Sequence, residues 1–141
     1  MTIRRVVVDH VDLRVQGLEA SRTFYVATLA PLGYTLQAES EKSVSFGVKG
    51  ADDFGIHRSE HPTVNAHVAF VSPSKEAVDT FYASALVGGG RSRVPPQLHP
   101  EYHAQYYAAY VFDPDGNNIE AVYHGGGTSG AVQAEGEGVE G

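Results

Sequence analysis

The chain has 141 residues, a formal net charge of -7 and 42% hydrophobic residues, which is enough for the core of one domain or two small modules. It contains no cysteine, so disulfides and thiolate sites are excluded and any metal must be bound through nitrogen and oxygen. The acidic charge, without a basic stripe, argues against nucleic-acid binding. Since no apolar run is long enough for a signal peptide or a membrane span, we expect a cytoplasmic protein with no membrane partner.

Two stretches of the sequence resemble each other at a constant offset of 57 residues. The first runs from His10 to Gly33 and the second from His67 to Gly90, and both contain Glu-Ala, Thr-Phe-Tyr and a leucine at matching positions. This agreement indicates a tandem duplication. Each copy places a histidine on its opening strand, so two copies that face each other would bring His10 and His67 together.

The first copy predicts a strand, a helix and three further strands. Residues 6–15 alternate between apolar and polar side chains, which is typical of a strand with one buried face. Residues 19–32 have the apolar spacing of a helix. Three extended runs follow at residues 34–39, 43–48 and 54–58, separated by turn-forming residues.

The second copy predicts the same order of elements. A strand begins at His67, and a helix follows with capping hydroxyls and a first-turn proline from Ser72-Pro73-Ser74. Gly88-Gly89-Gly90 ends that helix. We expect the later strands at residues 91–94, 106–112 and 118–123, the last two joined by a tight turn at residues 113–117.

These elements predict an α+β fold of two paired βαβββ modules, at residues 1–62 and 63–124. A helix covers only one face of a four-stranded sheet, so we expect a curved mixed sheet with helices outside and a concave metal-binding cleft. Residues 125–141 are rich in glycine and glutamate and predict a flexible tail.

Alternation along the strands assigns candidate side chains to the concave face. Leu13 and its apolar neighbours should pack under the helix, which leaves His10 in the cleft, and the repeat places His67 equivalently. Glu120 lies on the strand face opposite Ile119, where a carboxylate is costly to bury unless it is paired or bound to a cation. Two imidazoles and one carboxylate would hold a divalent metal with open positions for substrate. A single strand histidine is more often structural, but here both copies retain one.

Four segments resemble the vicinal oxygen chelate superfamily, which includes glyoxalase I, bleomycin-resistance proteins, fosfomycin-resistance transferases and extradiol dioxygenases. They are Asp9-His10-Val11-x-Leu13-x-Val15, Phe24-Tyr25 of the first helix, Ala66-His67-Val68-Ala69-Phe70 and the segment from Asp113 to Glu120. The resemblance spans roughly residues 6 to 124. It implies paired βαβββ modules with a metal held by His10, His67 and Glu120.

The fourth metal ligand of glyoxalase I has no counterpart in the sequence. The resemblance implies a glutamate on the last strand of the first module, but residues 54–58 read Phe-Gly-Ile-His-Arg. Either water or His57 would take this position, and we expect water. Two histidines and one glutamate are closer to the set in extradiol dioxygenases, which would use iron(II), and in fosfomycin-resistance transferases, which would use manganese.

Aromatic and imidazole side chains are concentrated between Pro95 and Tyr110, as in loops that contact ligands. Tyr110 matches the position from which transferases of the superfamily offer a tyrosine to substrate, although a strand tyrosine also commonly fills a core. A phenol there could donate to a developing oxyanion. The predicted catalytic residues are Glu120 and Tyr110, and the predicted substrate-binding residues are Tyr110, His103, Tyr107 and Tyr106.

We expect a glyoxalase-like or dioxygenase-like enzyme, of the lyase, dioxygenase or transferase type, that uses one divalent ion. The ion would bind a small oxygen-rich substrate and stabilise an anionic intermediate, and iron, manganese, zinc, nickel and cobalt all suit the ligands. The alternative is a non-catalytic drug- or ligand-sequestering protein of the bleomycin-resistance type, and a third reading is a structural metal site. Free edge strands favour a homodimer, with the metal ligands from one chain or from two.

Overall fold

The chain forms two βαβββ modules, and the computed structural model describes residues 7–126. The first module consists of β1 (Val11–Val15), α1 (Leu18–Leu29), a 3-10 turn η1 (Ala30–Leu32), β2 (Thr35–Glu39), β3 (Ser43–Gly47) and β4 (Phe54–Arg58). The second consists of β5 (His67–Val71), α2 (Lys75–Val87), β6 (Arg91–Leu98), β7 (Tyr107–Phe112) and β8 (Asn118–Tyr123). The predicted α+β fold of paired βαβββ modules is confirmed. Most of the predicted tail, residues 127–141, lies outside the described residues.

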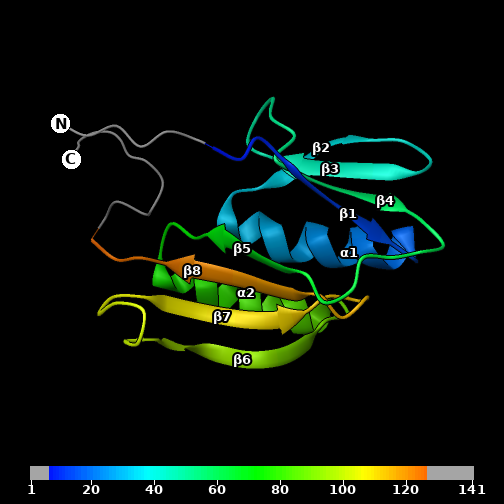
Figure 1. Ribbon diagram of the computed structural model, residues 1–141. Coiled ribbons are helices and arrows are strands. Elements are labelled where there is room, and N and C mark those ends of the chain that lie inside the picture. Colours follow the sequence, from blue (N-terminus) through cyan, green and yellow to red (C-terminus); the bar gives the residue numbers. More distant parts are fainter. Residues whose placement is uncertain (1–6, 127–141) are drawn as a thin grey trace.

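Each module builds its own four-stranded sheet (Figure 1). The strand orders are β1-β4-β3-β2 and β5-β8-β7-β6, with β1 parallel to β4, β5 parallel to β8 and the other pairs antiparallel. Hydrogen bonds between strands therefore stay within a module, and one chain has two sheets rather than a single continuous one. As a result, β1 and β5 are both edge strands. The proposed module boundary at residues 62 and 63 falls between β4 and β5.

The helix-covered faces of the two sheets share one hydrophobic core. Leu13 and Val15 of β1 and Ile119 and Ala121 of β8 belong to it, together with the buried faces of both helices. The two helices pack against each other, and α1 lies between the two sheets (Figure 1). The other face of each sheet, which carries the candidate site residues, therefore points away from this shared core.

The turn between β7 and β8 links the two modules through hydrogen bonds. The Asp113 carboxylate accepts backbone hydrogen bonds from Asp115 and Asn117 at 2.9 Å each, and a 2.5 Å hydrogen bond from the Tyr25 hydroxyl of α1. The Asn117 side chain bonds the backbone at Thr63 and Ala66. The predicted turn thus also organises the entry to β5.

Several elements differ from the sequence prediction in their bounds. The strand predicted over residues 6–15 is confined to Val11–Val15 among the described residues, and the helix predicted over residues 19–32 runs from Leu18 to Leu29 and is followed by the 3-10 turn. The Ser74 hydroxyl caps α2 by accepting a bond from the Ala77 amide at 3.0 Å, so Pro73 precedes the helix instead of lying in its first turn. Strand β6 continues to Leu98, through two prolines, where a loop was predicted. An edge strand tolerates proline because one side of its backbone needs no partner, and the β6 register shifts around these residues.

None of the helices within residues 7–126 has the length and apolar content that a membrane crossing requires.

Candidate functional site

Glu120 and His67 lie together on the open face of the second sheet. Glu120 is only 1% exposed at the middle of β8, and His67 is at the start of the neighbouring strand β5. One oxygen of the Glu120 carboxylate is 2.8 Å from Nε2 of His67. The other accepts a 2.5 Å hydrogen bond from the Tyr106 hydroxyl. Both oxygens of the buried carboxylate thus have a polar partner. One of these partners, the His67 imidazole, is itself a potential metal ligand.

A cluster of aromatic side chains surrounds this pair. Tyr110, Ala108 and Val122 are buried together on this face of the sheet, with Tyr106 packed against them. Burial and the nearby Glu120 carboxylate raise the pKa of both Tyr106 and Tyr110. Both phenols therefore remain protonated at neutral pH, and Tyr106 uses its proton in the hydrogen bond to Glu120. The face, as predicted by alternation, combines one carboxylate, one imidazole and two phenols.

His99 is a buried member of this cluster that the sequence did not single out. Its ring lies 5.4 Å from that of Tyr110 and 6.2 Å from that of Tyr106, centroid to centroid. Its Nε2 atom is buried and has no hydrogen-bond partner in the described part of the chain. The aromatic composition of residues 95–110 pointed to this segment, but only the pairing of β6 with β7 shows that His99 reaches the Glu120 face.

The remaining predicted substrate-binding residues separate onto two faces. His103 borders the cluster, because its ring is 5.4 Å from that of Tyr106 and its Nε2 is 2.9 Å from Nδ1 of His124. Tyr107 faces α2, where its hydroxyl donates a 2.6 Å hydrogen bond to Asp79, which raises the pKa of Tyr107 to about 12. The structure does not bring Tyr107 to Glu120, and we leave it out of the proposed site.

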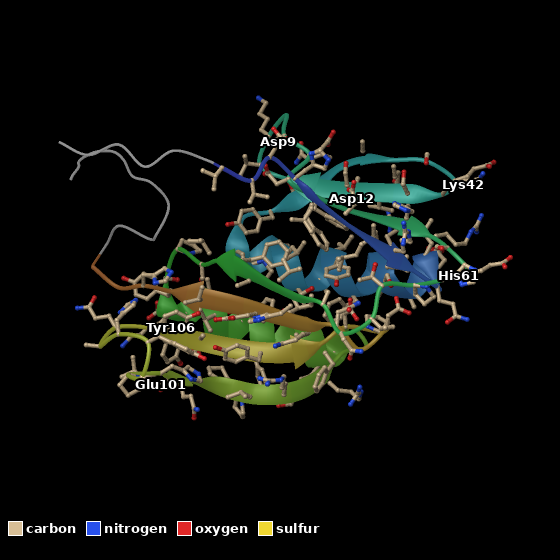
Figure 2. All side chains as sticks on the ribbon, in the orientation of Figure 1. Asp9, Asp12, Lys42, His61, Glu101 and Tyr106 are labelled. Atoms are coloured by element: carbon tan, nitrogen blue, oxygen red, sulfur yellow. The ribbon has the colours of Figure 1, made fainter. Side chains whose placement is uncertain are left out.

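His10 lies in the other module, directly before β1. Its Nδ1 is 2.8 Å from Oδ1 of Asp9 and its Nε2 is 3.8 Å from Oδ2 of Asp12. The bond with Asp9 and the charge of Asp12 raise the pKa of His10. These residues line an open cavity of about 770 Å³ on the first sheet, with Asp52, His57 and others. Figure 2 shows Asp9 and Asp12 beside the first sheet and Tyr106 beside the second.

One chain therefore contains two separate parts of the predicted site. We call the residues His10 and Asp12 the first half-site, and the residues His67, Glu120 and Tyr106 the second half-site. Among residues 7–126, no three His, Asp or Glu side chains converge in a way that would hold a metal ion. Within a single chain, the three predicted ligands are not brought to one point.

Comparison with known families identifies the fold family. The profile of the Glyoxalase/Bleomycin resistance protein/Dioxygenase superfamily matches residues 7–121. The chain belongs to this superfamily. A comparison with curated protein sequences gave no match.

Solved structures of the superfamily resemble this chain over most of its length. A glyoxalase/bleomycin resistance protein from Albidiferax ferrireducens T118 is 31% identical, with a TM-score of 0.71 over 81% of this chain and 95% of that one. A family enzyme from Burkholderia phytofirmans PsJN is 19% identical, with a TM-score of 0.65 over 84% and 99%. A glyoxalase I mutant from Zea mays is 23% identical, with a TM-score of 0.62 over 80% of this chain and 44% of that one. The last two likenesses establish the fold alone.

Proposed function

We propose that the protein is a metal-dependent enzyme in which His10 of one chain and His67 and Glu120 of a second chain bind one divalent ion. The observation that carries this proposal is the Glu120 carboxylate, which is buried in an aromatic cluster and lies 2.8 Å from Nε2 of His67. Burying a carboxylate costs several kcal/mol unless a cation or hydrogen bonds compensate, so such a residue is expected to have a specific role.

The donor set suits a divalent transition metal. Imidazole nitrogen and carboxylate oxygen together bind iron, manganese, zinc, nickel and cobalt, and two imidazoles with one carboxylate leave coordination positions for substrate. The Asp9 carboxylate bonded to Nδ1 of His10 would orient that ring and leave Nε2 for the ion, as outer carboxylates commonly do for ligating histidines. The residues present therefore fit the metal that the superfamily generally uses.

A second copy of the chain would supply the missing half-site. His10 directly precedes β1 and His67 begins β5, and both strands are at sheet edges, so the edges of two chains could meet there. Exposed valines flank these edges, Val7 and Val8 before β1 and Val64 before β5. In a homodimer with two-fold symmetry, the contact occurs twice and would form two equivalent sites.

The protein groups around Glu120 would then act on a small oxygen-rich substrate. When bound, the divalent ion would supply Lewis acidity toward substrate oxygens. The protonated Tyr110 hydroxyl can donate a hydrogen bond to negative charge that develops on those oxygens, while Tyr106 keeps its own donor on Glu120. The aromatic cluster, including His99, would limit the access of water, which strengthens these interactions.

The second candidate is a ligand-sequestering protein without chemistry, like the bleomycin-resistance proteins. It is favoured by the acidic lining of the cavity on the first sheet, which includes Asp9, Asp12 and Asp52 and suits a cationic ligand. It is also favoured by the separation of the half-sites within one chain. The two candidates differ in whether they need a resident metal.

Elemental analysis of protein purified without chelator separates the candidates. The enzyme proposal predicts about one metal ion per chain, lost in a His67→Ala variant that remains folded by circular dichroism. A metal-free wild type that also fails to take up Mn²⁺, Fe²⁺, Co²⁺ or Zn²⁺ in equilibrium dialysis would refute it and favour sequestration.

A further inference from the structure

The internal repeat identifies the residue that corresponds to Glu120 in the first module. In the second module, Ala69 of β5 lies opposite Glu120 of β8. In the first, Asp12 of β1 lies opposite Gly55 of β4. Asp12 and Ala69 are equivalent positions, because they differ by the repeat offset of 57 residues. Gly55 therefore corresponds to Glu120. In the first module the carboxylate is on β1 and the small residue on β4, whereas in the second module the small residue is on β5 and the carboxylate on β8.

Asp12 occupies the space that a side chain on Gly55 would need. A Cβ atom built on Gly55 would overlap Oδ1 of Asp12, and the next heavy atoms are Cγ of Asp12 at 3.5 Å and the Val44 carbonyl oxygen at 3.9 Å. The Asp12 carboxylate is the main obstacle to a side chain there. The absence of a side chain at Gly55 is what allows this carboxylate to lie over β4.

Each carboxylate faces the Nε2 atom of its own module's histidine. The distance from Oδ2 of Asp12 to Nε2 of His10 is 3.8 Å, and that from Oε1 of Glu120 to Nε2 of His67 is 2.8 Å. On His10, the Nδ1 atom is already bonded to Asp9. The two half-sites therefore have the same composition, one imidazole and one carboxylate, although their carboxylates come from different strands.

We infer that Asp12 supplies the carboxylate ligand that β4 of the first module lacks, so that His10 and Asp12 of one chain and His67 and Glu120 of another complete a four-ligand metal site. This inference rests on the metal binding proposed above. It replaces the water expected from the sequence, and also the alternative His57, which lies opposite Arg14, further along the β4 strand. A set of two nitrogen and two oxygen donors would bind the ion more tightly than three donors.

The test measures Co²⁺ binding by calorimetry and by the visible absorption of the bound ion, neither of which requires an enzyme assay. Asp12→Asn should weaken Co²⁺ binding by about 10- to 100-fold and change the absorption, because a ligand is lost. The matched control is Asp52→Asn, which removes the same charge from the same cavity, where Asp52 bonds the Ser45 hydroxyl. It should change the affinity by less than about threefold, as expected for an exposed charge that solvent screens and that does not ligate the ion.

A rescue variant tests the exchange of strands directly. Asp12→Ala should bind weakly, and Asp12→Ala combined with Gly55→Glu should recover most of the affinity, because the carboxylate then comes from β4 as it does from β8 in the second module. If the double variant binds no better than Asp12→Ala, the exchange is refuted.

The outcomes separate this inference from the proposed function. If the wild type binds Co²⁺ and Asp12→Asn binds it equally well, or no worse than Asp52→Asn, the inference falls and the three-ligand proposal stands. If the wild type binds no metal, both fall. Asp12→Ser replaces Asp12→Asn if the latter does not fold.

Discussion

The Tyr106 hydroxyl and the Nε2 atom of His67 contact different oxygens of the same buried carboxylate, that of Glu120. In the chain without metal, these two contacts compensate for the desolvation of the carboxylate. A cation bound at His67 and Glu120 would take over part of that role. The stability of the second module should therefore depend on Tyr106 and on metal in a linked way.

Tyr106→Phe should destabilise the metal-free protein by about 1.5–3 kcal/mol, the usual cost of losing a hydrogen bond to a charged group. Saturating metal should reduce the difference in unfolding free energy between Tyr106→Phe and wild type. Metal binding stabilises the folded state of both proteins, and the bound cation offsets the desolvation of the Glu120 carboxylate. Urea denaturation with and without Zn²⁺ measures both effects. The control is Tyr102→Phe, an exposed ring next to Tyr106. Equal stability of the Tyr106 and Tyr102 variants would contradict the role of this bond.

Glu120→Gln should abolish most metal binding while the fold is retained. The amide has nearly the same shape and can still accept the hydrogen bond from Tyr106, but it is a poor ligand for a divalent ion. We expect the metal content to fall at least about tenfold, measured by elemental analysis after dialysis. Glu101→Gln, which removes an exposed carboxylate of the same module, should retain the wild-type content. Retention of metal by the Glu120 variant would remove this residue from the site.

Tyr25→Phe should weaken the contact between the two modules, because the Tyr25 hydroxyl of α1 donates a hydrogen bond to the Asp113 carboxylate in the second module. We expect a loss of about 1.5–3 kcal/mol near pH 7. Burial, together with the charge and hydrogen bond of Asp113, raises the pKa of Tyr25 well above 10.0. The folded protein therefore favours the protonated phenol, so the stabilisation is complete below about pH 10, the unfolded pKa, and declines above it.

The difference in unfolding free energy between wild type and Tyr25→Phe should accordingly be constant from pH 7 to 9 and shrink above about pH 10. Denaturation curves across this range measure it. A free-energy difference that grows with increasing pH would have the wrong sign and would contradict the raised pKa of Tyr25 in the folded protein.

Alternation and the internal repeat predicted most of the fold. The predicted bounds of the strands at residues 54–58 and 118–123 match β4 and β8, and the faces of Ile119 and Glu120 are as expected. These features depend on local periodicity, which the sequence records directly. The extension of β6 was missed, because its prolines are tolerated only at a sheet edge and the strand order is a tertiary property.

The site was predicted less completely for the same reason. The pattern assigns His10, His67 and Glu120 to open sheet faces, but it does not say which faces meet. In one chain the modules join through their helices, which keeps the half-sites apart. The relation of Asp12 to Gly55 and the position of His99 depend on strand register, so they became visible only in the structure.

The central claim, that two chains share each metal site, is tested most directly by mixing two defective chains. If two chains share each site, a heterodimer of His10→Ala and His67→Ala chains, co-expressed with different affinity tags, would contain one intact site and one site that lacks both histidines. We predict that each variant homodimer is essentially metal-free and that the heterodimer holds one ion per dimer, measured by elemental analysis. A heterodimer as empty as the homodimers, alongside a metal-containing wild type, would contradict the account.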